Sequence, residues 1–265
     1  MKKLQVLLAA GVASGLTALA TVVAMAEAQP PVVPTNTEAP AVVGTAQDGE
    51  LLAAKDGEWS GKDPMTFTYQ WQICDVAGGN CANVNGASAK IYRVATTDVG
   101  RRLRVQVTAK NTSGSKTATT AVTPAVVQPT GATRLQDGKY SIPAASVKQP
   151  YRLVLSGLQF TPTVLRSRQP FTGRFRVTDN RGYIVRDAIV LVTGVPLGWI
   201  FASQEVKTNL DGYAEIQLQP TTRLRLVRGG SMVMFIRARR EGDDLLAGIS
   251  TRRLVRVRTA APASR

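Results

Sequence analysis

The sequence contains no histidine and only two cysteines among its 265 residues. Without histidine, the chain lacks the commonest general base, the commonest zinc ligand and every catalytic triad that relies on imidazole. Two cysteines are too few for a cysteine-rich zinc or iron–sulfur site. We therefore expect no metal and no cofactor.

Recognisable catalytic motifs are missing as well. The sequence has no P-loop, no GxSxG, no HExxH and no dinucleotide-binding fingerprint. Acidic residues of the second half fall mostly at expected turns, and no pair of them has an argued common site. A glycosidase stays an alternative, and it requires two acids that face each other in a cleft. The expected protein is not an enzyme but a binding or structural module.

A long uncharged apolar run opens the chain. Lys2 and Lys3 precede residues 4–25, which are small and apolar, and two small-x-small patterns end at Ala26 and Ala28. This arrangement is typical of a cleaved secretory signal peptide over residues 1–28. The alternative is a retained membrane anchor, because the run is long enough to cross a bilayer. No second run of that length follows, so we expect a secreted or envelope-associated, extracytoplasmic protein without a transmembrane span in the mature chain.

Export determines how the two cysteines are interpreted. Cys74 and Cys81 are seven residues apart, and in an oxidising compartment so close a pair is expected to form a local disulfide. Gly78, Gly79 and Asn80 supply the positive-φ positions that the reversal between them needs. Redox or metal chemistry is the alternative, although two thiols without histidine are a poor ligand set.

Residues 41–127 and 152–259 read as two series of short strands separated by turns. Residues 66–73 and 101–110 alternate polar and apolar side chains, and a period of two puts one face in a core and the other in water. Such strands, with frequent turn signals between them, favour antiparallel sandwiches. We predict an all-β chain of two antiparallel β-sandwich domains, with an extended lead-in over 29–40, a linker over 128–151 and a tail over 260–265.

The first domain contains Tyr69-Gln70-Trp71, then both cysteines, then Asp98-Val99-Gly100. In order and spacing these residues resemble the immunoglobulin-like repeat of secreted and surface proteins of actinobacteria, over about a third of the chain. The resemblance implies an immunoglobulin-like sandwich with Trp71 in the core of its central strand. The cysteines bracket one hairpin, which differs from the inter-sheet bridge of antibody domains.

The second domain repeats a turn-and-strand pattern. A turn at residues 179–182 leads into a strand in which Val185, Ala188 and Val190 return to the core, and residues 208–216 use the same device. This pattern resembles the bacterial immunoglobulin-like domains of the invasin type. Together the two resemblances imply two immunoglobulin-like domains on a bacterial cell surface, in an adhesion or scaffold role without a general enzymatic activity.

Positive charge is concentrated in the second half. Residues 27–128 carry nine Lys and Arg against nine Asp and Glu, whereas residues 129–265 carry 22 against nine, a net charge of +13. Several arginines stand two apart, among them Arg223 and Arg225, and on a strand this spacing puts both side chains on one face. If residues 232–240 and 252–258 pair as the last hairpin, four or more arginines share a sheet face. The candidate anion-binding residues are Arg174, Arg176, Arg237, Arg239, Arg256 and Arg258.

Arginine binds phosphate and carboxylate groups bidentately, so the expected partner is an anionic polymer of the cell envelope, or another surface protein. Sequence-specific nucleic-acid binding is not expected, because no nucleic-acid-binding motif is present. The arginines also have explanations without a ligand: coding bias, the need for polar groups at outward positions, and protection of edge strands from aggregation.

A carbohydrate-binding module is the alternative function. It requires an exposed, flat aromatic patch, and the chain has only Trp59, Trp71 and Trp199 as tryptophans. Trp199 is compatible with either a sugar-binding platform or packing in the core, and we interpret Trp59 as a packing residue.

Overall fold

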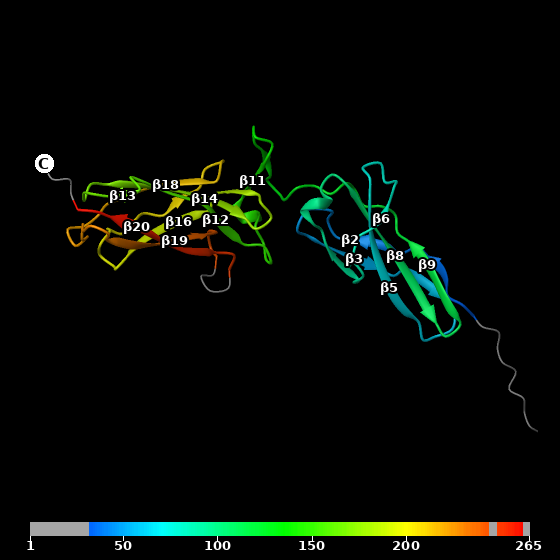
Figure 1. Cartoon of the computed structure of the whole chain (residues 1–265). Coiled ribbons are helices and arrows are strands. Elements are labelled where there is room, and N and C mark those ends of the chain that lie inside the picture. The colour runs from blue at the N-terminus through cyan, green and yellow to red at the C-terminus, as the bar shows by residue number, and fades with distance from the viewer. Residues whose placement is uncertain (1–31, 244–247, 262–265) are drawn as a thin grey trace, which may run out of the picture.

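The computed structural model describes residues 32–243 and 248–261, which form two β-sandwich domains arranged end to end (Figure 1). The expected signal peptide, residues 1–28, lies outside the described residues. Among the residues that are described, the only helices are two 3-10 turns, and no helix is long and apolar enough to cross a bilayer. The strands of the first domain are β1 (Thr35–Glu38), β2 (Ala41–Val43), β3 (Leu51–Lys55), β4 (Glu58–Ser60), β5 (Thr66–Cys74), β6 (Ala82–Asn83), β7 (Ile91–Arg93), β8 (Arg102–Asn111) and β9 (Gly114–Thr119).

The first domain packs the sheet β2-β3-β7 against the sheet β6-β5-β8-β9, and β1 pairs with β4 beside them. Strand β8 shows the predicted alternation, with Leu103 and Val105 fully buried and the residues between them facing outward. Trp71 on β5 is also fully buried. Its ring stacks on Tyr92 with centroids 5.4 Å apart, and its indole Nε1–H donates to the carbonyl of Ala89 at 3.0 Å. The predicted core position of Trp71 is confirmed.

The predicted disulfide between Cys74 and Cys81 is present, with the two Cα atoms 4.0 Å apart. It closes the loop between β5 and β6, where the Asp75 carboxylate accepts hydrogen bonds from the Gly79 N–H at 2.8 Å and from Asn80 Nδ2 at 2.7 Å. Both bonds lower the pKa of Asp75, and the bond from the Gly79 N–H has the larger effect. The bridge therefore fixes one hairpin and does not join the two sheets.

The second domain stacks two larger sheets. One has the order β10-β11-β15-β14-β12, with β18 also paired to β14, and the other has the order β13-β20-β19-β16-β17. Phe175 from the first sheet and Ile236 from the second are fully buried in one core between them. The strands are β10 (Thr133–Arg134), β11 (Tyr140–Pro143), β12 (Leu153–Thr161), β13 (Val164–Leu165), β14 (Phe171–Asp179), β15 (Ile184–Arg186), β16 (Ile189–Val195), β17 (Val206–Lys207), β18 (Tyr213–Leu218), β19 (Ser231–Arg239) and β20 (Thr251–Thr259).

The all-β fold of two β-sandwich domains is confirmed, and most strand pairs are antiparallel as predicted. Two pairs, β11–β15 and β13–β20, are parallel. Both pairs join segments that are far apart in the chain, so no hairpin turn determines their direction.

Part of the expected linker pairs with the second domain. Within residues 128–151, β10 and β11 form a hairpin, and β11 adds to β15. Ile142 on β11 is fully buried in the core of that domain, and this burial holds the segment to it. Within the expected lead-in, β1 forms and pairs with β4.

The expectation that Arg223 and Arg225 share a strand face is wrong, because residues 221–230 form no strand. Leu224 between them is fully buried. Its backbone carbonyl accepts hydrogen bonds from the Arg168 guanidinium, at 3.1 Å from Nε and 2.9 Å from Nη2. A side chain thus satisfies the backbone group that a neighbouring strand would otherwise satisfy.

A buried ionic network joins the two domains. The Asp48 carboxylate of the first domain is fully buried and lies 3.4 Å from Nη1 of Arg181 in the second. It also accepts hydrogen bonds from the hydroxyls of Tyr183 and Thr96, both at 2.8 Å. Arg181 in turn pairs with Asp179 of its own domain at 2.8 Å. One guanidinium thereby pairs with a carboxylate from each domain.

The two domains pack closely around this network. The Arg181 guanidinium lies over the ring of Tyr151, 4.1 Å from its centroid. Gly49 has φ +90°, and a Cβ there would lie 2.8 Å from Arg181 Nη1, so this position requires glycine. At the rim, Lys148 and Glu50 form an exposed ion pair at 2.7 Å.

Candidate functional site

The hairpin of β19 and β20 places arginines on the outer face of its sheet. Residues of β19 alternate between buried and partly exposed, with Ile236 and Ala238 inward and Arg237 and Arg239 outward. Directly paired residues of antiparallel strands point to the same side. The register pairs Arg237 with Arg252, Val233 with Arg256 and Ser231 with Arg258. The outward arginines, which we call the arginine face, are Arg237, Arg239, Arg252, Arg256 and Arg258.

The arginine face has a part that is paired with an acid and a part that is open. Glu205, which precedes β17, binds Arg239 at 2.7 Å and Arg237 at 3.5 Å, and both guanidinium-bearing side chains are only 20% exposed. By contrast, Arg256 and Arg258 are exposed, and their side chains have no ion pair or hydrogen bond within residues 32–243 and 248–261. The open part is therefore the one that is available to an external anion.

The other two predicted residues lie elsewhere. Arg174 and Arg176 are on β14, in the opposite sheet, with Phe175 between them in the shared core. Arg174 pairs with Glu215 at 3.2 Å, and both arginines lie over the ring of Tyr213, at 3.9 and 5.2 Å from its centroid. The structure thus divides the six predicted arginines between two outer faces of the sandwich.

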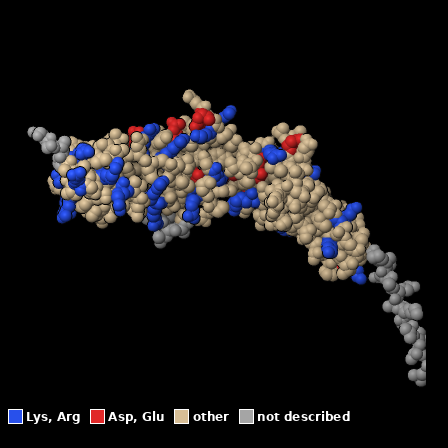
Figure 2. Space-filling model, viewed as in Figure 1, with Lys and Arg blue, Asp and Glu red and all other residues tan. Residues whose placement is uncertain are grey.

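Apolar side chains are interleaved with the arginine face. Leu254 is 66% exposed and lies opposite Phe235, which is half-buried. Figure 2 shows Lys and Arg side chains spread over the second domain, whereas Asp and Glu gather along one of its edges. The face therefore offers guanidinium groups beside apolar surface, a combination that suits a ligand with alternating charge and hydrocarbon.

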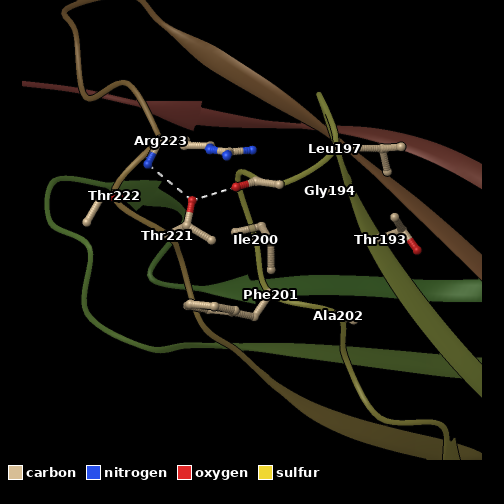
Figure 3. Close-up of a pocket in the computed structure, with 10 residues that line it drawn as sticks. Thr193, Gly194, Leu197, Ile200, Phe201, Ala202, Thr221, Thr222 and Arg223 are labelled. Atoms are coloured by element: carbon tan, nitrogen blue, oxygen red, sulfur yellow. Dashed lines mark hydrogen bonds between the residues drawn. The ribbon is translucent and has the colours of Figure 1, made fainter.

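A separate cleft of about 540 Å³ lies beside the loop that follows β16 (Figure 3). Leu197 and Phe201 border it with exposed apolar side chains, Ile200 lines it, and Arg223 reaches over it from residues 221–223. This cleft was not predicted from the sequence, because its two sides come from segments that meet only in the folded domain. Glu205 was missed for the same reason, since it lies 34 residues from Arg239.

The tryptophans do not form a flat exposed patch. Trp71 is fully buried, and Trp59 and Trp199 are partly buried and pack against the two cores. Two buried acids, Asp48 and Asp179, both face Arg181 in the domain junction. Within the described ranges, no group of three or more potential metal ligands comes together.

No protein-family model matches the chain, and no curated protein matches it. Among solved structures, the D00-D0 domain of intimin has a TM-score of 0.28 and 11% identity, covering 84% of this chain and 98% of that one. The titin domains Z1Z2 in complex with telethonin have a TM-score of 0.28 and 11% identity, covering 89% of this chain and 100% of theirs. The FN1-FN3 domains of chicken CNTN1 have a TM-score of 0.31 and 9% identity, covering 88% of this chain and 68% of theirs. All three scores are low, so no ligand or partner is inferred from these proteins.

Proposed function

We propose that the chain is an extracellular binding module that holds an anionic envelope polymer on the arginine face of its second domain. The observation that carries the proposal is the register of β19 and β20, which leaves Arg256 and Arg258 exposed, adjacent and without an acidic partner in the described ranges. The apolar N-terminal run and the disulfide between Cys74 and Cys81 support a location outside the cytoplasm.

The mechanism is bidentate binding of repeated anionic groups. Two residues that stand two apart on a strand have Cα atoms roughly 6.8 Å apart, so Arg256 and Arg258 present two guanidinium forks along one line. Like charges on one face repel, and an anionic ligand removes that repulsion. Because both side chains are solvent-exposed, salt should screen the attraction strongly.

The test is elution of the chain from immobilised polyphosphate and from immobilised polyglutamate with a salt gradient, which separates phosphate from carboxylate recognition. The double variant Arg256→Ser/Arg258→Ser should elute at clearly lower salt than the native chain. Arg174→Ser/Arg176→Ser removes the same charge from the opposite face and should elute close to the native chain. Equal losses in the two double variants would show that only net charge matters and would contradict the proposal.

Glu205→Gln provides an opposite arm of the same test. The substitution frees Arg237 and Arg239 from their shared carboxylate and extends the open part of the arginine face. This variant should therefore elute at higher salt than the native chain. Unchanged elution would mean that this face does not contact the polymer.

A further inference from the structure

The cleft beside the β16–β17 loop is held open by the backbone around it. The Trp199 carbonyl accepts from the Thr221 N–H at 2.9 Å, and the Phe201 N–H donates to the Gln219 carbonyl at 2.9 Å. The Thr221 hydroxyl donates to the Gly198 carbonyl at 2.6 Å and accepts from the Arg223 N–H at 3.1 Å (Figure 3). These bonds tie the two sides together, so the cleft exists before any ligand arrives.

The walls of the cleft are apolar and their edges are exposed. Ile200 forms a buried wall, and it packs so close to Gly194 that a Cβ there would lie 2.8 Å from Ile200 Cγ1. Leu197 and Phe201 stand at the edges, 76% and 61% exposed. Large apolar side chains that gather around a cleft and remain in water mark a binding site more often than a scattered surface residue does.

Arg223 supplies the only charge that lines the cleft within the described residues. Its guanidinium has no ion pair or hydrogen-bond partner there, and Nη1 would lie 3.1 Å from a Cβ at position 198, where Gly198 has φ +83°. Glycine at that position therefore leaves the guanidinium its place against the loop. An unpaired guanidinium beside apolar walls is complementary to a carboxylate attached to an apolar group.

The cleft continues in one direction. A second hollow of about 270 Å³ shares Phe201 and Ala202 with it and runs toward β18. Arg223 lines the first hollow and not the second. A peptide that runs through both hollows therefore reaches Arg223 at only one of its ends. We expect the terminal carboxylate of the peptide at that end.

We propose that this groove binds the C-terminal end of an extended peptide. The apolar side chain of the last residue lies between Leu197, Ile200 and Phe201, and the terminal carboxylate pairs with Arg223. The preceding residues pass Phe201 and Ala202 toward β18. This site is separate from the arginine face and does not depend on the function proposed for it.

The experiment measures binding of the full chain to an N-terminally labelled pentapeptide by the fluorescence anisotropy of the label. The last two residues of the peptide are leucine and phenylalanine. The free acid should bind about tenfold more tightly than the C-terminal amide, since a charge-assisted hydrogen-bond pair is lost with the amide. An amidated peptide with an aspartate side chain near its end should bind like the plain amide. Equal affinity for acid and amide, or no binding of either, would overturn the proposal.

Three variants complete the design. Arg223→Gln should abolish the difference between acid and amide, whereas Arg225→Gln, a neighbouring exposed arginine outside the cleft, should keep it. Phe201→Ser should weaken acid and amide by the same factor, because it removes apolar wall and leaves the guanidinium. A difference that survives Arg223→Gln would assign the carboxylate to another cation and would refute the role of Arg223.

Discussion

Replacing Arg181 by glutamine should destabilise the chain far more than any exposed ion-pair change. Arg181 is 6% exposed and binds two carboxylates, Asp48 across the junction and Asp179 within its own domain, each with no exposed side-chain surface. Without the guanidinium both carboxylates stay buried, with only neutral hydrogen-bond donors around them. The substitution therefore leaves uncompensated charge in a low-dielectric junction.

The expected magnitude follows from burial. Removing one partner of a buried ion pair costs about 3–5 kcal/mol of unfolding free energy. The lower end applies here, because Asp48 keeps the hydroxyls of Thr96 and Tyr183 and Asp179 keeps backbone N–H donors. The matched control is Lys148→Gln, whose pair with Glu50 is 66% and 37% exposed and contributes at most about 1 kcal/mol.

The assay is urea unfolding of the full chain, read by circular dichroism, together with small-angle X-ray scattering of the native state. Arg181→Gln should lower the free energy of unfolding by about 3 kcal/mol and broaden the distribution of interdomain distances. Asp48→Asn removes only the cross-domain charge and keeps the Arg181–Asp179 pair, so it should cost less stability yet broaden the scattering similarly. A loss in Arg181→Gln no larger than in Lys148→Gln would refute the reasoning.

Two further predictions concern the disulfide and the buried tyrosine. The variant Cys74→Ser/Cys81→Ser should lower the unfolding free energy of the first domain by about 2.5 kcal/mol, the chain-entropy value for so short a loop, and an unchanged urea midpoint would contradict it. Burial, and next the hydrogen bond to Asp48, raise the pKa of Tyr183 above its ordinary 10.0. As pH rises, the unfolded chain therefore loses the Tyr183 proton before the folded chain does, so the folded state should lose stability above pH 10.0. The urea midpoint of Tyr183→Phe should then fall less between about pH 9 and about pH 11 than that of the native chain. Parallel pH profiles of the native chain and Tyr183→Phe would contradict this assignment.

Local patterns predicted the fold well. The alternation in residues 66–73 and 101–110 corresponds to β5 and β8, because a period of two already specifies which face meets a core. The turn at residues 179–182 forms as expected, with the Gly182 N–H donating to the Asp179 carbonyl at 3.1 Å. The strands that escaped prediction, such as β10 and β13, are two residues long and show no period.

The candidate site was predicted only in part. The spacing of Arg256 and Arg258 placed them on one face, since both lie on the same strand. Their separation from Arg174 and Arg176 depends on which sheet each strand joins, and neighbouring residues do not determine that. The pairing of Arg237 and Arg239 depends on Glu205, which reaches them from the loop between β16 and β17.

What the sequence alone determined is what arises between residues close in the chain: the strands with clear alternation, the turns between them, and the disulfide across one hairpin. What only the tertiary structure decided is what requires distant segments to meet. Asp48 and Arg181 are 133 residues apart, and the two sides of the cleft beside the β16–β17 loop come from separate segments. Such contacts depend on how whole sheets pack, and no local periodicity records that arrangement.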